Sequence, residues 1–230
     1  MKLGLPKLER IHNYITLGII LSLIIALVFE IINKNYEFLF ITVLSIFLCL
    51  IPYLFQKRYR IYLPSEIQLA IIAFIYAGIF LGEVRNFYVK YWWWDSLLHT
   101  FSGFAMGLII FGIMFVLYKT EKIRTSPVFI AIIIFSISIT MGVVWEIYEY
   151  AYDNTTGYGN MQRARNLCPE TGFCDSRVGL LDTMKDFILN TIGSGFAAIL
   201  GYVYFKTGRQ FLLNGVIDDF VRKNPKLFYK

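Results

Sequence analysis

The chain has 230 residues, of which 57% are hydrophobic and 18% aromatic, while only 17% are charged. This composition is more apolar than that of an average soluble domain. The charged residues gather between long uncharged runs, a pattern typical of proteins that cross a membrane several times. The net charge of +6 comes from Lys and Arg in short loops, so it predicts membrane topology and argues against a nucleic-acid partner.

Six apolar runs are each near the length of about 20 residues that a membrane-spanning helix needs. A helix-start signal supports the fifth run, because Ser126 precedes Pro127. We therefore predict an all-α, polytopic membrane protein: a bundle of six transmembrane helices that forms a single membrane domain over 1–230. The predicted spans are 14–32, 38–55, 65–81, 97–118, 127–150 and 180–205.

Lys and Arg set the predicted orientation, since cytoplasmic loops carry an excess of both. With the N-terminus in the cytoplasm, most of the 22 Lys and Arg residues lie in cytoplasmic segments. We therefore predict an N-in, C-in, multi-pass protein of the cell membrane, with an outer loop at 151–179 and a cytosolic tail at 206–230. Apolar residues recur with helical spacing in this tail, which predicts either an amphipathic helix on the inner leaflet or a plain cytosolic tail.

The three cysteines fit this topology. Cys49 lies inside a span and is expected to be a small apolar filler. Cys168 and Cys174 lie in the outer loop, where an oxidising compartment would allow a disulfide between them. A two-cysteine metal site is the alternative, which the absence of histidine from this loop disfavours.

Polar residues recur at the same end of three spans, and Glu30 lies at a similar depth near the end of the first. Spacings of three or four residues place each set on one face of its helix. Small residues continue those faces, so we expect the last three spans to pack closely with their polar groups facing one another. The sets are Asp95 and His99 in the fourth span, Glu146 and Glu149 in the fifth, and Asp182, Asp186 and Asn190 in the sixth.

Carboxylates at close range need counter-charge. A divalent cation is one solution; with one histidine among many carboxylates, Mg²⁺ or Mn²⁺ is favoured over a structural Zn²⁺, and Ca²⁺ and Fe stay open. Proton relay and pairing with outer Lys and Arg residues are the others. Ordinary interfacial or helix-capping roles compete with all three, but the coincidence of depth across three spans favours a shared site. The candidate cation ligands are Glu146, Glu149, Asp182, Asp186 and His99.

The leading hypothesis is a membrane-embedded, metal-dependent hydrolase or transferase with its site in the outer half of the bundle, acting on a lipid or lipid-linked substrate. His99 would be the general acid or base, oriented by Asp95. An ion- or proton-coupled transporter is the first alternative, because intramembrane carboxylates also build ion paths. A non-catalytic membrane scaffold with a structural polar cluster is the second. The other assigned residues are Glu146, Glu149, Asp182 and Asp186, which would hold a cation or activate water, and Arg163, Arg165, Arg177 and Asn190, which would bind an anionic substrate group.

The motifs also carry a family resemblance. The pattern Asp95-xxx-His99-xxx-Gly103, then Glu146-xx-Glu149, then Asp182-xxx-Asp186-xxx-Asn190-xx-Gly193 resembles the YjdF-like family of uncharacterised inner-membrane proteins. More distantly, it is similar to VanZ-like membrane proteins, from whose usual pattern the chain departs at Glu149 and in the loop that holds Cys168 and Cys174. The resemblance covers about 95–201 and implies a multi-span membrane protein with no settled activity.

Overall fold

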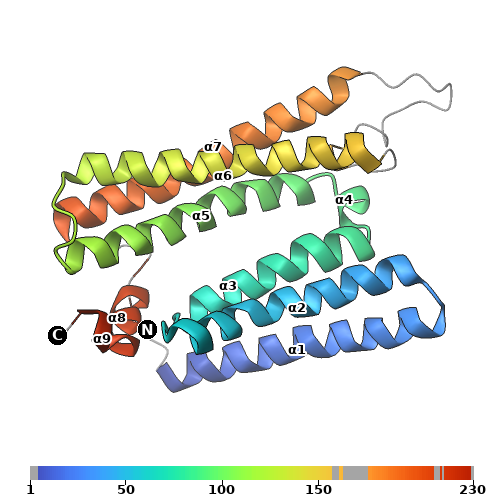
Figure 1. Cartoon of the computed structure of the whole chain (residues 1–230), viewed down its shortest axis with the longest axis horizontal. Helices are drawn as coiled ribbons and strands as arrows, with labels where there is room; N and C mark the ends of the chain where they lie inside the picture. Colours follow the sequence, from blue (N-terminus) through green and yellow to red (C-terminus); the bar gives the residue numbers. More distant parts are fainter. Residues whose placement is uncertain (1–4, 157–160, 163–175, 210–212, 214, 229–230) are drawn as a thin grey trace. The chain divides into compact units, whose positions relative to one another are not determined.

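The structure is a computed structural model that describes residues 5–156, 161–162, 176–209, 213 and 215–228. These residues form helices and no strand (Figure 1). Six of the helical segments are long and apolar enough to cross a membrane, which confirms the predicted all-α fold and its spans. Each predicted span lies inside one of these segments, which are Arg10–Ile32, Phe38–Tyr59, Ser65–Val84, Trp94–Lys119, Pro127–Thr155 and Arg177–Thr207.

The described residues divide into two compact units. Unit 1 comprises those within Met1–Trp94 and Leu213–Lys230, and unit 2 those within Asp95–Leu212. The helices of unit 1 are α1 (Leu5–Ile32), α2 (Tyr36–Tyr59), α3 (Ser65–Ile75), the π-helix η1 (Tyr76–Val84), α4 (Phe87–Lys90), α8 (Val216–Lys223) and α9 (Pro225–Phe228). Those of unit 2 are α5 (Trp94–Lys119), whose first residue belongs to unit 1, α6 (Pro127–Thr156) and α7 (Ser176–Thr207).

In unit 1, α1, α2 and the continuous α3–η1 segment pack around an apolar core. This core contains Leu23, Ile72, Phe80 and Cys49, so the prediction that Cys49 fills apolar space is confirmed. Among the described residues of the unit, two acidic residues are buried, Glu30 of α1 and Asp219 of α8. Glu30 of α1 is 5% exposed and accepts a hydrogen bond of 2.9 Å from the hydroxyl of Thr42 on α2, which satisfies part of its hydrogen-bonding capacity.

The third span changes from α-helix to π-helix after Ile75. A π-turn lengthens the backbone hydrogen-bond register and is often associated with an inserted contact or a functional position. At the start of this π-helix, the indole Nε1 of Trp94 donates to the carbonyl oxygen of Ala77 at 3.2 Å. The hydroxyls of Tyr76 and Ser22 lie 3.0 Å apart and link the segment to α1. No sequence pattern predicted this change of helix type.

The C-terminal segment folds back onto the loop that precedes α3. The amide of Asn224 accepts a hydrogen bond from the backbone nitrogen of Tyr62 and donates one to its carbonyl oxygen, at 2.7 and 2.8 Å. Ile217 and Asp219 are buried in α8. The tail therefore contains a helix, which was one of its two expected forms, and Ile217 of this helix is buried in unit 1.

In unit 2, α5, α6 and α7 lie along one another at very short range (Figure 1). A Cβ atom at Gly103 of α5 would overlap the backbone oxygen of Asn190 on α7, and one at Gly193 of α7 would overlap the backbone oxygen of Thr100 on α5. Ser138 of α6 completes the contact by donating to the carbonyl oxygen of Gly103 at 2.6 Å. The predicted close packing of the last three spans through small residues is confirmed.

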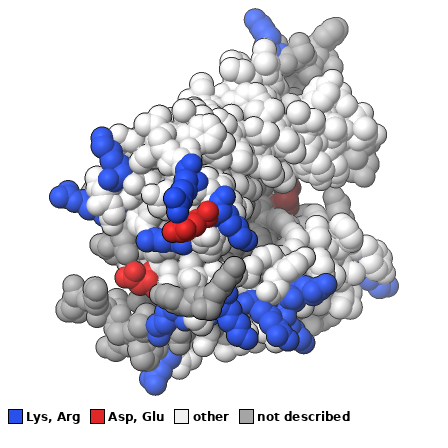
Figure 2. All heavy atoms as spheres, turned by 60° about the vertical axis from the view of Figure 1, so that its left-hand side comes forward, with Lys and Arg blue, Asp and Glu red and all other residues white. Residues whose placement is uncertain are grey.

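The turn between α5 and α6 is basic. Lys119, Lys122 and Arg124 are exposed there, and Arg124 pairs with Glu121 at 3.0 Å. Figure 2 faces this end of α5 and α6, where Lys and Arg side chains predominate over Asp and Glu. The oxygen of Ser126 accepts a hydrogen bond from the nitrogen of Phe129 at 3.2 Å, so α6 begins with the capping residue that the sequence indicated.

Candidate functional site

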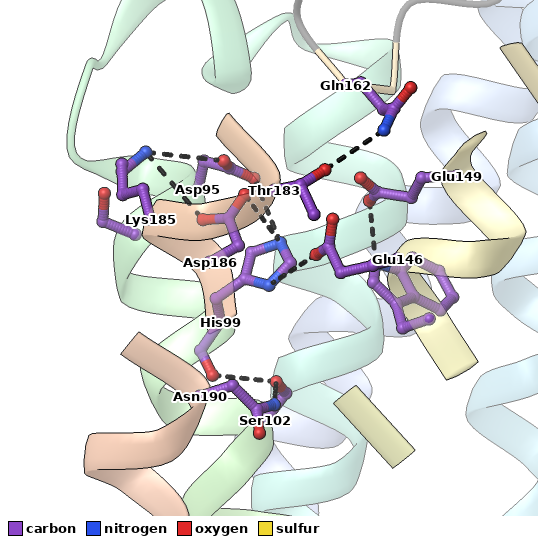
Figure 3. Close-up of polar contacts among 12 residues, drawn as sticks. Asp95, His99, Ser102, Glu146, Glu149, Gln162, Thr183, Lys185, Asp186 and Asn190 are labelled. Atoms are coloured by element: carbon purple, nitrogen blue, oxygen red, sulfur yellow. Dashed lines mark hydrogen bonds and ion pairs between the residues drawn. The ribbon is translucent and has the colours of Figure 1, made fainter. Parts of the chain in front are cut away.

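A buried histidine lies at the centre of the polar residues of unit 2 (Figure 3). His99 comes from α5, and three carboxylates surround its ring. Its Nε2 atom is 3.6 Å from Oδ1 of Asp95 and 3.8 Å from Oδ2 of Asp186, while its Nδ1 atom is 3.6 Å from Oε1 of Glu146. The predicted facing of spans four, five and six therefore brings one acid from each of them to the same imidazole.

Two of these acids, Asp186 and Glu146, are buried without hydrogen bonds to their side-chain oxygens from the described residues. Asp186 is 1% exposed and Glu146 is 4% exposed. Neither oxygen of either side chain accepts a hydrogen bond from any described residue. Burying a carboxylate is unfavourable unless hydrogen bonds or an opposite charge compensate it, so the arrangement leaves capacity for a bound ligand.

Three of the groups have the spacing of a metal site. One oxygen of Asp95, one oxygen of Asp186 and one nitrogen of His99 lie within 4.8 Å of one another. Two carboxylates and an imidazole are a donor set that a divalent cation accepts. Both aspartates approach Nε2 of His99, so this nitrogen is the one that would face a cation between them, while Glu146 lies beside the opposite nitrogen.

A lysine lies next to this group. The ammonium nitrogen of Lys185 is 3.8 Å from Oδ2 of Asp95 and 3.9 Å from Oδ1 of Asp186 (Figure 3). Its side chain is 44% exposed. It therefore provides positive charge to the two aspartates without a direct hydrogen bond to either.

A chain of hydrogen bonds ties the segment after α6 to α7 beside the site. Asp153 accepts from the backbone nitrogens of Met161 and Gln162 at 2.9 and 3.0 Å. The side-chain amide of Gln162 donates to the hydroxyl of Thr183 at 3.1 Å (Figure 3). These contacts fix side chains near Glu146, and sequence reasoning found none of the three, because hydrogen bonds from an irregular loop follow no helical period.

Further polar side chains link the helices next to the acids. The amide nitrogen of Asn190 is 3.5 Å from the hydroxyl of Ser102, and its oxygen accepts from Ser194 at 3.3 Å. The hydroxyls of Ser194 and Ser138 lie 2.8 Å apart. Asn190, predicted as a substrate ligand, thus lies among side chains that connect α5, α6 and α7.

The other predicted site residues lie in different places. Glu149 is buried on α6 and accepts a hydrogen bond of 2.7 Å from the indole nitrogen of Trp145 on the same helix. Asp182 is half-buried near the start of α7, and Arg177 is exposed one turn before it. The predicted substrate residues Arg163 and Arg165 lie outside the described residues, and so does the predicted disulfide between Cys168 and Cys174.

Comparison with known proteins gives a family but no activity. The model of a family described as "Predicted membrane protein (DUF2238)" matches residues 15–207. An uncharacterized protein of Thermotoga maritima is 27% identical over 160 residues, which cover 70% of this chain and 73% of that protein. No solved structure matches. The expectation of an uncharacterised membrane family is confirmed, whereas neither comparison names the YjdF-like or VanZ-like proteins.

Proposed function

The chain belongs to the family described as "Predicted membrane protein (DUF2238)", and on this premise we propose that it is a membrane-embedded enzyme that binds a divalent cation at Asp95, His99 and Asp186. Its substrate is a lipid or a lipid-linked molecule, and its reaction is a hydrolysis or group transfer. The burial of Asp186, with neither oxygen bonded to a described residue, carries this proposal.

The geometry supports separate roles for the four central residues. Asp95, Asp186 and Nε2 of His99 hold the cation. Glu146 lies 3.6 Å from Nδ1 of the same ring, and its negative charge favours a proton on Nδ1, which leaves Nε2 as the ligand. A bound divalent cation would polarise a substrate oxygen or lower the pKa of a water molecule. Mg²⁺ and Mn²⁺ remain the favoured ions.

The position of the site along the helices supports a lipid-related substrate. The acids lie in the same half of three helices that are long and apolar enough to span a bilayer, so they are nearer to the head groups of one leaflet than to those of the other. The exposed basic residues of the α5–α6 turn lie at the other end of α5 and α6. By the excess of Lys and Arg in cytoplasmic loops, this favours the N-in, C-in orientation in the cell membrane and a site on the outer side.

The surroundings of the site favour an enzyme over an ion-coupled transporter. The hydroxyl and amide contacts that begin at Asn190 extend to Ser138. Beyond Ser138, the described core of unit 2 is apolar and contains Ile134, Ala197 and Phe111. A polar path to the other end of the helices is therefore not formed by the described residues, whereas ion paths need such groups.

A cation-binding experiment tests the proposal. Purified protein in detergent is titrated with Mn²⁺, and free Mn²⁺ is followed by electron paramagnetic resonance. We expect one bound ion in the wild type and a loss of affinity of roughly tenfold to a hundredfold in Asp186→Asn, because a charged ligand becomes neutral. Asp218→Asn, which changes an exposed acid of α8, should bind as the wild type does. A folded wild type that binds no Mn²⁺ would refute the cation site.

A second measurement separates an enzyme from a scaffold with a structural ion. The protein is reconstituted with a bacterial total lipid extract and the cation, and the lipids are analysed by mass spectrometry over time. The enzyme hypothesis expects a lipid to be consumed by the wild type and not by Asp186→Asn. Cation binding without any lipid conversion would leave the scaffold as the better explanation.

A further inference from the structure

Lys185 lies next to the same two acids that would bind the proposed cation. Its ammonium lies 3.8 Å from Asp95 and 3.9 Å from Asp186, and these carboxylates also belong to the group that could hold a metal ion. Its ammonium thus lies within 4 Å of both carboxylates. A divalent cation between the aspartates would therefore take over the role of Lys185 as counter-ion.

The side chain of Lys185 is free to move when a cation binds. It is 44% exposed, and both of its ionic contacts are longer than a hydrogen bond. An ammonium on a four-carbon stem can move at little cost when a neighbouring cation repels it. Asp186, by contrast, is almost completely buried, so the acid stays in place while the lysine moves away from it.

We infer that Lys185 is the anion-binding residue of this site and that it takes one oxygen of a phosphate group whose neighbouring oxygen binds the cation. This inference rests on the proposed function and names the substrate class: a phosphate ester. Once the cation neutralises Asp95 and Asp186, the displaced ammonium is a positive charge released from these two carboxylates beside a metal. An ammonium next to a divalent cation is a favourable environment for a phosphate oxygen.

The test measures cation and phosphate binding separately on the full-length protein. Mn²⁺ binding is first measured alone in the wild type and in Lys185→Met. Phosphate binding is then followed through the broadening of the ³¹P resonance by Mn²⁺ already bound to the protein. The probes are inorganic phosphate in detergent and phosphatidate in nanodiscs that otherwise contain phosphatidylcholine, which distinguish a free phosphate from a lipid head group.

We expect Lys185→Met to bind Mn²⁺ as tightly as the wild type or more tightly, since a competing ammonium is gone. Its affinity for whichever phosphate probe the wild type binds should fall by roughly tenfold to a hundredfold, the effect of losing a hydrogen bond between charged groups. Lys185→Arg, which keeps the charge, should restore phosphate binding. Lys206→Met is the matched control, because Lys206 lies at the other end of α7 and contacts Tyr202.

Two results would overturn the inference and are distinguishable from each other. If the wild type holds Mn²⁺ but neither phosphate probe, or if Lys185→Met holds phosphate as well as the wild type, the role of Lys185 is wrong while the cation site stands. If the wild type binds no Mn²⁺, the cation is never present to displace the lysine, and both proposals fail together.

Discussion

The two units of the molecule bury acids in different ways. In unit 1, Glu30 is the acid of a three-helix packing, and Thr42 donates to one of its oxygens while the other accepts no hydrogen bond from the described residues. In unit 2, three acids surround one histidine, and both oxygens of two of those acids lack such a bond. A single hydroxyl therefore partly satisfies Glu30 in unit 1, whereas in unit 2 Lys185 lies near two of the acids and the oxygens of Glu146 and Asp186 accept no hydrogen bond from the described residues.

The units also differ in how their helices meet. The described glycine of α1, Gly18, has nothing within reach of an added Cβ, and large apolar side chains form the core of unit 1. In unit 2, Gly103 and Gly193 let the backbones of α5 and α7 touch. Backbone contact fixes the separation of two helices more strictly than flexible side chains do. The difference suggests that unit 2 is built to hold its acids at fixed distances.

The largest expected effect is on this backbone contact. Gly193→Ala places a Cβ against the backbone oxygen of Thr100 and 2.8 Å from the backbone nitrogen of Phe104. Unlike a side chain, these backbone atoms cannot relieve the overlap by changing rotamer. We expect a loss of about 3 kcal/mol in the free energy of unfolding, the upper part of the usual range for overpacking, measured by unfolding in SDS.

The control for that variant lies in the same unit. Gly112 of α5 has nothing within 4 Å of an added Cβ, so Gly112→Ala should be neutral or raise stability by up to about 1 kcal/mol through its better helix propensity. Equal stabilities for the Gly193→Ala and Gly112→Ala variants would show that the close approach of α5 and α7 is unimportant.

The second prediction compares how Glu30 and Glu146 contribute to stability. Thr42→Val removes the hydroxyl that donates to Glu30, and we expect unit 1 to lose about 1 kcal/mol, because hydrogen bonds inside membrane proteins contribute that order of energy. Glu146→Gln removes a carboxylate that accepts no hydrogen bond from the described residues. Without metal, this variant should therefore unfold at the wild-type temperature or above it.

Metal removal sharpens the same comparison. Chelation should lower the thermal stability of Thr42→Val and of the wild type by the same amount, about 2.7 kcal/mol for an ion present at a hundred times its dissociation constant. Thermal unfolding in detergent, with and without EDTA, measures both. A larger loss of stability on adding EDTA in Thr42→Val than in the wild type would mean that Glu30, rather than the cluster of unit 2, depends on the ion.

Two regular patterns in the sequence allowed the spans, and the way in which three helices face one another, to be predicted. Long apolar runs mark the spans, and intervals of three or four residues gave each helix one polar face. Glycines on those faces predicted that the backbones approach. The sequence therefore located Asp95, His99, Glu146 and Asp186 before their contacts were visible.

Other features of the site follow from tertiary contacts that no period encodes. Pairing of the acids with Lys185 was one of the expected alternatives, but only the rotation of α7 shows that its ammonium lies near both Asp95 and Asp186. Gln162 comes from an irregular segment. Glu149 accepts a hydrogen bond from Trp145, four residues earlier on the same helix, a contact that helical spacing allows but does not require.

The smallest expected effect concerns α8, which lies outside the spans and has an acid that its own helix neutralises. Burial acts to raise the pKa of Asp219, but hydrogen bonds from Arg222 and Lys223 outweigh it and hold this pKa below its ordinary value. A lowered pKa means that the acid stabilises the fold fully above its unfolded pKa of about 3.9, and that this contribution is lost as the pH falls through the lower folded value.

Hydrogen exchange followed by mass spectrometry measures this contribution in α8. Protection of the helix, corrected for the intrinsic exchange rate, should be constant from pH 6 to about 4 and should fall below that value. Asp219→Asn should show reduced protection that does not change over the same range, while Asp218→Asn, at an exposed position, should follow the wild type. Because α8 neutralises Asp219 with its own Arg222 and Lys223, added Mn²⁺ should leave its protection unchanged. Protection of α8 that rises with Mn²⁺ would contradict the distinction between Asp219, which is paired within its own helix, and the acids proposed to bind a cation.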